Sequence, residues 1–141
     1  MRFEGAPWYL FQQRNVAEGD TGQMQIANLT KRTELAWNAS AASSFWQRLI
    51  GLLGRRSLPA GEALLLQPCR SVHTLFMRFA IDLVYVDTQM TVVKTVQGLR
   101  PFRISGALRR AHAVIELPAG ALLRSGTAVG DQLAVRSATD E

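Results

Sequence analysis

Two side chains that could do chemistry lie close together in the sequence: the thiol of Cys69 and the imidazole of His73. A cysteine becomes a strong nucleophile when a histidine lies within hydrogen-bond reach, at roughly 3–4 Å. In an extended chain, which rises about 3.3 Å per residue, the two Cα atoms would be about 13 Å apart. A Cys–His dyad therefore requires a turn between residues 69 and 73, and a small buried cysteine is the simpler interpretation.

Asp82 is a carboxylate inside an apolar run, Ile81–Val86, which predicts a strand buried on both faces. Burying a carboxylate alone costs several kcal/mol, so Asp82 must be paired or hydrogen-bonded. It could lock the adjacent connection through backbone N–H groups or through Arg78. Alternatively, it could form one wall of a small polar pocket, whose candidate residues are His73, Thr74, Arg78 and Asp82.

The sequence carries no pattern that is typical of a metal or cofactor site. Its two histidines, His73 and His112, lie far apart, and no carboxylates accompany them at ligand spacing. No glycine-rich phosphate loop and no G-x-S-x-G elbow is present. We therefore expect no metal and no cofactor.

The net charge of +5, from 16 basic and 11 acidic residues, is concentrated in one segment. Residues 88–115 contain five basic residues and no acidic one, and four of the five lie in a stretch that Pro101 and Gly106 mark as a loop: Arg100, Arg103, Arg109 and Arg110. Guanidinium groups match carboxylates and phosphates, so this loop could dock an acidic protein, a small anionic ligand or an anionic lipid. An ordinary solvated loop is the alternative. Nucleic acid is disfavoured, because only Phe102 could stack on a base.

The elements that must position these residues are mostly strands. A hairpin is expected from Met24 through a turn near residues 31–33, and further strands at Ala63–Gln67, Ser71–Phe76, Ile81–Val86, Thr91–Val96, Ala113–Leu117 and Leu133–Val135. One capped helix is expected at about Phe45 to Leu53, and a single helical turn at Ala121–Ser125. Glu116 is expected to accept hydrogen bonds from turn amides near Gly120. The predicted fold is mainly β, a small antiparallel β-barrel or a folded-over sandwich with one short helix.

The bulk properties indicate one domain in a soluble chain. We expect residues 1–23 to be a loose N-terminal extension, residues 24–136 a single β domain, and residues 137–141 a tail. No window of about 18 apolar residues suggests a transmembrane segment. The first twenty residues lack the apolar stretch of roughly 7–15 residues that a signal peptide needs, so a cytoplasmic location is expected.

Several short motifs follow one another in a fixed order: Arg48, Gly51-Leu52, Gly54-Arg55, Gly61, Leu65, His73-Thr74, Met77-Arg78, Ile81-Asp82, Glu116 to Gly120 and Gly130-Asp131. In this order they resemble the signature of a prokaryotic family known as domain of unknown function 192, over about residues 25–136. The resemblance implies a compact, mostly antiparallel β fold. It implies no reaction, and many members of the family are exported.

The sequence therefore favours a non-enzymatic binding or accessory domain over an enzyme. Its expected features are a small polar pocket near His73 and Asp82 and an arginine-rich loop for an anionic ligand or an acidic partner. The alternative is a small hydrolase or transferase that uses His73 and Asp82, with Cys69 as the nucleophile.

Overall fold

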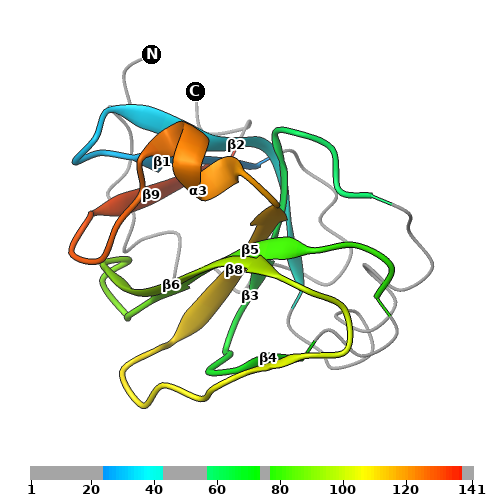
Figure 1. Ribbon diagram of the computed structural model, residues 1–141. Coiled ribbons are helices and arrows are strands. Elements are labelled where there is room, and N and C mark those ends of the chain that lie inside the picture. The colour runs from blue at the N-terminus through cyan, green and yellow to red at the C-terminus, as the bar shows by residue number, and fades with distance from the viewer. Residues whose placement is uncertain (1–23, 43–56, 74–76, 138–141) are drawn as a thin grey trace.

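The computed structural model describes residues 24–42, 57–73 and 77–137, and within them the chain is mainly β (Figure 1). The helix predicted at Phe45–Leu53 lies outside the described residues. The described elements are β1 (Met24–Asn28), β2 (Thr33–Ala42), β3 (Glu62–Leu66), β4 (Val72–His73), β5 (Ile81–Val86), β6 (Val92–Leu99), β7 (Ile104–Ser105), β8 (Ala113–Pro118), α3 (Ala121–Ser125) and β9 (Leu133–Ser137).

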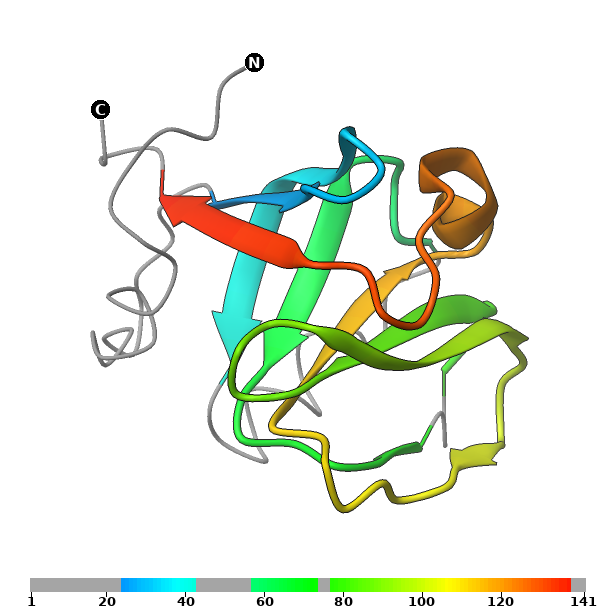
Figure 2. The ribbon, with the colours of Figure 1, turned by 90° about the vertical axis from the view of Figure 1, so that its left-hand side faces the viewer.

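Seven strands form one sheet in the order β6-β5-β8-β3-β2-β1-β9, and β4 pairs with β7 in a second, two-stranded sheet. The large sheet curls into a half-barrel, so that its β5–β6 hairpin comes back beside the turn that precedes β9 (Figure 2). There, Thr91 and Gln132 form an isolated antiparallel bridge, and the Val92 amide donates to the Asp131 carbonyl at 2.9 Å. The prediction of a mainly β, curled sheet is confirmed.

One pairing within this sheet is not antiparallel. β2 and β3 run parallel, with Asn38 opposite Glu62 and Ala42 opposite Leu66. Parallel neighbours need a long crossover between them, because the chain must return to the same end of the sheet. The chain between Ala42 and Glu62 is long enough for such a crossover. The sheet is therefore mostly antiparallel, as the family resemblance implies, with one parallel pair.

Each face of the sheet covers its own apolar core, because side chains alternate along a strand. On β5, Val84 and Val86 join a core that also contains side chains from β1, β2, β9 and α3. The alternate residues of β5, Ile81, Leu83 and Tyr85, join a second core with Val72 of β4 and Leu66 of β3. β5 is thus buried on both faces, as its apolar run predicts.

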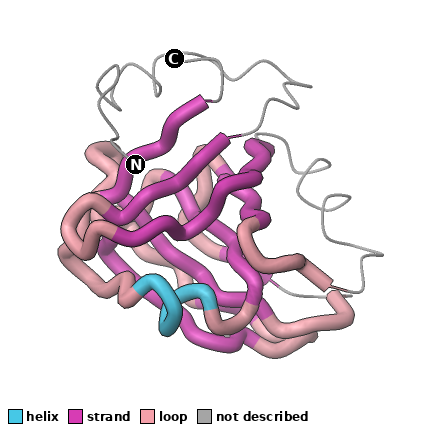
Figure 3. The backbone as a smooth tube through the Cα atoms, turned by 90° about the horizontal axis from the view of Figure 1, so that it is seen from above, coloured by secondary structure: helices cyan, strands magenta, loops and turns pink. Residues whose placement is uncertain are grey.

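The short helix α3 lies at the rim of the half-barrel (Figure 3). The sequence predicts this helical turn at Ala121–Ser125. It ends at Gly126, which adopts a left-handed conformation, φ 70°, and whose amide donates to the Leu122 carbonyl. Most predicted strand bounds agree with the structure to within a few residues. Of the predicted strand Ser71–Phe76, Val72 and His73 form β4, and residues 74–76 lie outside the described residues. The two-residue strand β7 was not predicted, because Pro101 and Gly106 mark its surroundings as a loop.

Candidate functional site

The arginine-rich loop, defined here as residues 100–110, is attached to the chain segment that carries Cys69 and His73. Its strand β7 pairs with β4, so that Ser105 lies opposite Val72 and Ile104 opposite His73. Beyond the paired residues, the Leu108 amide donates to the Arg70 carbonyl at 3.1 Å. The charge of the loop and the histidine, which are separate in the sequence, are therefore neighbours in the fold.

Tyr85 of β5 attaches the arginine-rich loop to the folded body of the protein. Its buried hydroxyl group makes a short hydrogen bond with the Ser105 hydroxyl group and donates to the Gly106 carbonyl at 3.5 Å. Lys94 also reaches this point, with its ammonium nitrogen 5.1 Å from the centroid of the Tyr85 ring and 3.4 Å from the Gly106 carbonyl oxygen. Burial raises the pKa of Tyr85, although the hydrogen bond with Ser105 opposes the shift, so the phenol stays a neutral donor.

The outer side of the loop is basic and partly apolar. Because Ser105 points inward to Tyr85, its neighbour Ile104 points outward, and 74% of Ile104 is exposed. Phe102 is 60% exposed and has a positive φ of 60°, which is rare for a bulky residue. All four predicted docking residues are exposed: Arg100, Arg103, Arg109 and Arg110. The Arg103 guanidinium group donates to the Phe102 carbonyl at 3.4 Å.

Asp82 is buried and accepts three backbone hydrogen bonds. One oxygen accepts from the Gly98 amide at 2.8 Å, and the other accepts from the amides of Gly120 and Leu122, each at 3.0 Å. Gly120 precedes α3 and supplies no side-chain cap, so a carboxylate from β5 satisfies the first amides of the helix. The interpretation of Asp82 as a lock through backbone N–H groups matches this geometry. Asp82 links β6 and α3 to β5. The sequence had indicated that it would lock the connection before β5.

Of the other predicted pocket residues, only Arg78 has a described side chain. Asp82 faces α3, with Val84 beside it in that core, whereas β4 lies against the opposite face of β5. Arg78 is exposed in the bend before β5. The His73 side chain and all of Thr74 fall outside the described residues, so a pocket that includes them stays a prediction.

Cys69 is buried in the second core, and its thiol donates to the Ser71 carbonyl at 3.1 Å. Glu116 lies on the same side of the sheet, opposite Leu64 and Leu83, and is also buried. The Gly120 amide, whose hydrogen bond Glu116 was expected to accept, donates to Asp82. Within the part of the chain that the structure describes, no three His, Cys, Asp or Glu side chains gather as metal ligands would, and no helix is long and apolar enough to cross a membrane.

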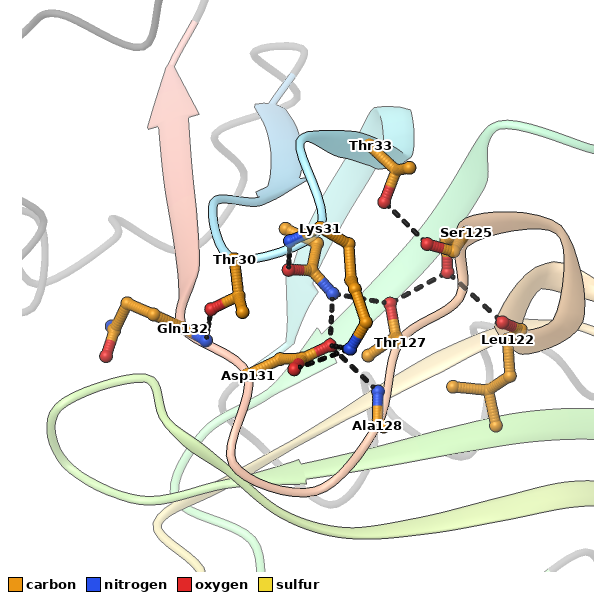
Figure 4. Close-up of polar contacts among 10 residues, drawn as sticks. Thr30, Lys31, Thr33, Leu122, Ser125, Thr127, Ala128, Asp131 and Gln132 are labelled. Carbon is orange, nitrogen blue, oxygen red and sulfur yellow. Dashed lines mark hydrogen bonds and ion pairs between the residues drawn. The ribbon is translucent and has the colours of Figure 1, made fainter.

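Another buried carboxylate, Asp131, joins the β1–β2 turn to the turn before β9 (Figure 4). It accepts hydrogen bonds from the Asn28 side chain at 2.8 Å, from the Lys31 ammonium group at 2.9 Å and from the Ala128 amide at 3.0 Å. Asn28 also donates to the Thr127 hydroxyl group at 3.1 Å. The sequence showed only a Gly130-Asp131 turn, because nothing local indicates that residue 28 lies beside it.

Asp131 should make the stability of the protein depend on acidity. Burial raises the pKa of its carboxyl group, but the hydrogen bonds from Asn28 and Lys31 outweigh burial and hold the pKa below its ordinary value of 3.8. The stabilisation is therefore fully present above that value and is lost as the pH falls through the folded-state pKa. We expect Asp131→Asn to lower the free energy of unfolding by about 1–2 kcal/mol near neutral pH.

The measurement is urea unfolding of wild type and Asp131→Asn at a series of pH values from about 6 down to about 3. The difference between the two proteins should shrink as the pH falls. Asp87→Asn is the control, because Asp87 accepts amides of an exposed turn and makes no ion pair among the described contacts. A difference between wild type and Asp131→Asn that stays constant with pH would contradict this role.

Comparison with known proteins places the chain in a family. The model of domain of unknown function 192, described as Uncharacterized ACR, matches residues 27–135. A UPF0127 protein of Pyrococcus furiosus is 32% identical over 113 residues, which cover 77% of this chain and 95% of that protein. A UPF0127 protein of Pyrococcus abyssi is 30% identical over 113 residues, with 77% and 94% covered.

Two crystal structures share the fold. One, from Sinorhizobium meliloti, carries the provisional description of a transcription regulator; it aligns with a TM-score of 0.68 and 22% identity over 83% of this chain and 93% of that one. The other is a protein of unknown function from Novosphingobium aromaticivorans, with a TM-score of 0.67, 17% identity, and 78% and 81% covered. The sequence match and the curled β-sheet agree, and the chain belongs to the uncharacterised family of domain of unknown function 192.

Proposed function

We propose that this protein is a non-enzymatic binding module that recognises an anionic ligand or an acidic partner through the arginine-rich loop. The observation that carries the proposal is the attachment of this exposed, basic loop to the folded body by β4 and by Tyr85. A loop that is already ordered loses little conformational entropy when it binds. Its exposed guanidinium groups suit carboxylates and phosphates.

His73 belongs to this proposal as a residue expected to border the binding surface, because its backbone pairs with Ile104 of the loop. Thr74 and Arg78 follow it toward β5. Asp82 has a structural role instead, since its two oxygens accept three amide hydrogen bonds. The hydrolase or transferase alternative gains no support from these contacts, because Asp82 is engaged with backbone amides and the Cys69 thiol donates to a carbonyl group.

Replacing two arginines of the loop should weaken binding to a polyanion. We expect Arg109→Gln/Arg110→Gln to bind immobilised polyglutamate about tenfold more weakly than wild type, since each exposed ion pair contributes a modest free energy. Retention on the polymer as salt is raised provides the measurement, because screening weakens such contacts.

The matched control is Arg32→Gln/Arg124→Gln, which removes the same charge from the β1–β2 turn and from α3, where both arginines are exposed. This variant should be retained like wild type. Equal losses in the two double variants would mean that only the net charge matters, and the proposed binding surface would then be wrong.

A further inference from the structure

The arginine-rich loop presents two large apolar side chains to solvent among its charges. Ile104 is 74% exposed and Phe102 is 60% exposed. The pairing of β7 with β4 and the contact of Ser105 with Tyr85 fix the inward side of the strand, so Ile104 must point away from the core. Phe102 has a left-handed backbone, φ 60°, and such strained conformations cost stability and cluster at functional sites.

The position of the loop limits what can contact these side chains. The segment between β6 and β8, in yellow, runs with β4 along the end of the molecule opposite α3 in two views (Figures 1 and 2). A peptide that adds to a sheet needs a strand edge several residues long, and β7 has two residues. A loop at the end of the molecule with outward apolar side chains suits a flat, deformable surface better than it suits an extended peptide.

The charges of the loop fit the interface of an anionic bilayer. Arg103 lies between the two apolar residues in sequence, Arg109 and Arg110 follow on the same loop, and residues 88–115 contain no carboxylate side chain that would be repelled. Near an anionic membrane surface each basic residue strengthens binding by about fivefold. Apolar side chains beside basic ones add to this by entering the boundary between headgroups and acyl chains.

We propose that the arginine-rich loop docks on the surface of an anionic phospholipid bilayer, with Phe102 and Ile104 inserted between the headgroups and Arg109 and Arg110 on lipid phosphates and carboxylates. This inference rests on the proposed function and names the anionic partner. Contacts with Tyr85 and β4 hold the arginine-rich loop in place, so insertion requires little reordering of the chain.

The test is co-sedimentation with phosphatidylcholine vesicles that contain about one-third phosphatidylserine, an anionic lipid of the kind that attracts basic segments. Wild type should sediment with these vesicles and stay in solution with pure phosphatidylcholine. Phe102→Ser/Ile104→Ser should bind at least about tenfold more weakly, because the two apolar side chains can no longer enter the lipid. Thermal unfolding should show that this double variant is folded.

The control is Leu123→Ser/Val129→Ser, which removes two apolar side chains that are 82% and 61% exposed outside the loop. It should bind like wild type. As a second measurement, brominated lipids should quench the fluorescence added by Phe102→Trp, whereas they should not quench that added by Leu123→Trp. Equal weakening by both serine pairs, or quenching at neither position, would overturn the insertion.

The outcomes also separate this inference from the proposed function. If retention on polyglutamate depends on Arg109 and Arg110 but wild type does not bind the vesicles, the lipid partner is wrong and the anion-binding loop stands. If wild type binds the vesicles and the Phe102→Ser/Ile104→Ser variant binds equally well, charge alone holds the protein to the membrane and the insertion is wrong. If Arg109→Gln/Arg110→Gln binds both polyglutamate and the anionic vesicles as well as wild type does, the proposed function itself fails.

Discussion

Asp82→Ala is expected to lower the free energy of unfolding by about 2–4 kcal/mol, because three backbone amides lose a charged acceptor at once. Leu122 is buried, so water cannot easily replace the acceptor at its amide. The loss should release α3 and the end of β6 from β5 together. Chemical denaturation measures the total effect, and amide hydrogen exchange at Leu122 and Gly98 shows where it falls.

Asp87→Ala is the matched control for this variant, since the Asp87 carboxylate also accepts backbone hydrogen bonds, from Gln89 and Thr91, but in a largely exposed hairpin turn. It should cost about 1 kcal/mol or less, because water can take over there. Should Asp82→Ala prevent folding, Asp82→Asn keeps one acceptor oxygen and should lie between wild type and alanine. An unchanged stability of Asp82→Ala would show that the lock is unimportant.

Gly61→Ala is expected to cost a similar amount, about 2–4 kcal/mol, through a steric mechanism. A Cβ atom at residue 61 would lie 2.0 Å from Cε2 of the Trp37 ring and 2.2 Å from its Cζ2. Gly61 also has a φ of +88°, which an L-residue adopts only with strain. The ring would have to leave its place against the backbone and its contact with Arg124, whose guanidinium carbon lies 5.9 Å from the ring centroid.

A double-mutant cycle separates the clash from the backbone strain. In a Trp37→Ala background, Gly61→Ala should cost only the strain of a positive φ, about 1 kcal/mol. Gly126→Ala provides the same comparison at a residue with a φ of +70° and no atom within 4 Å of the added Cβ. Equal costs at residues 61 and 126 in the wild-type background would exclude the clash as the cause.

The environment of Asp82 can be predicted from the sequence only in part. The apolar run around it correctly predicts burial and a need for hydrogen-bond donors. Its donors are amides of Gly98 and Gly120, which lie 16 and 38 positions away, so no local pattern could name them. For the Gly120 amide the sequence indicated Glu116, which is nearer in the chain, but the amide donates to Asp82, and Glu116 faces the other side of the sheet. The choice between two carboxylates was made by the alternation of side chains in neighbouring strands.

The chemistry of the proposed binding surface could be predicted from the sequence, but its location could not. The arginines could be identified by counting charges, whereas their position beside His73 depends on a two-residue strand in a segment with loop signals. A strand of two residues leaves no alternating pattern of apolar and polar residues in the sequence, so its pairing can be seen only in the folded chain. The same holds for the Tyr85 and Ser105 contact, which joins residues 20 positions apart, and for the parallel pairing of β2 with β3.

The first and last described strands lie side by side in the sheet, since β1 pairs with β9 along its whole length, from Met24 opposite Ser137 to Asn28 opposite Leu133. Pairing over such a sequence separation is slow, because the loop between the strands must close first. During synthesis, an edge of β1 therefore stays open until the residues of β9 have left the ribosome. We expect chains truncated before residue 133 to expose that edge and to aggregate, so the last strand decides when this sheet is complete.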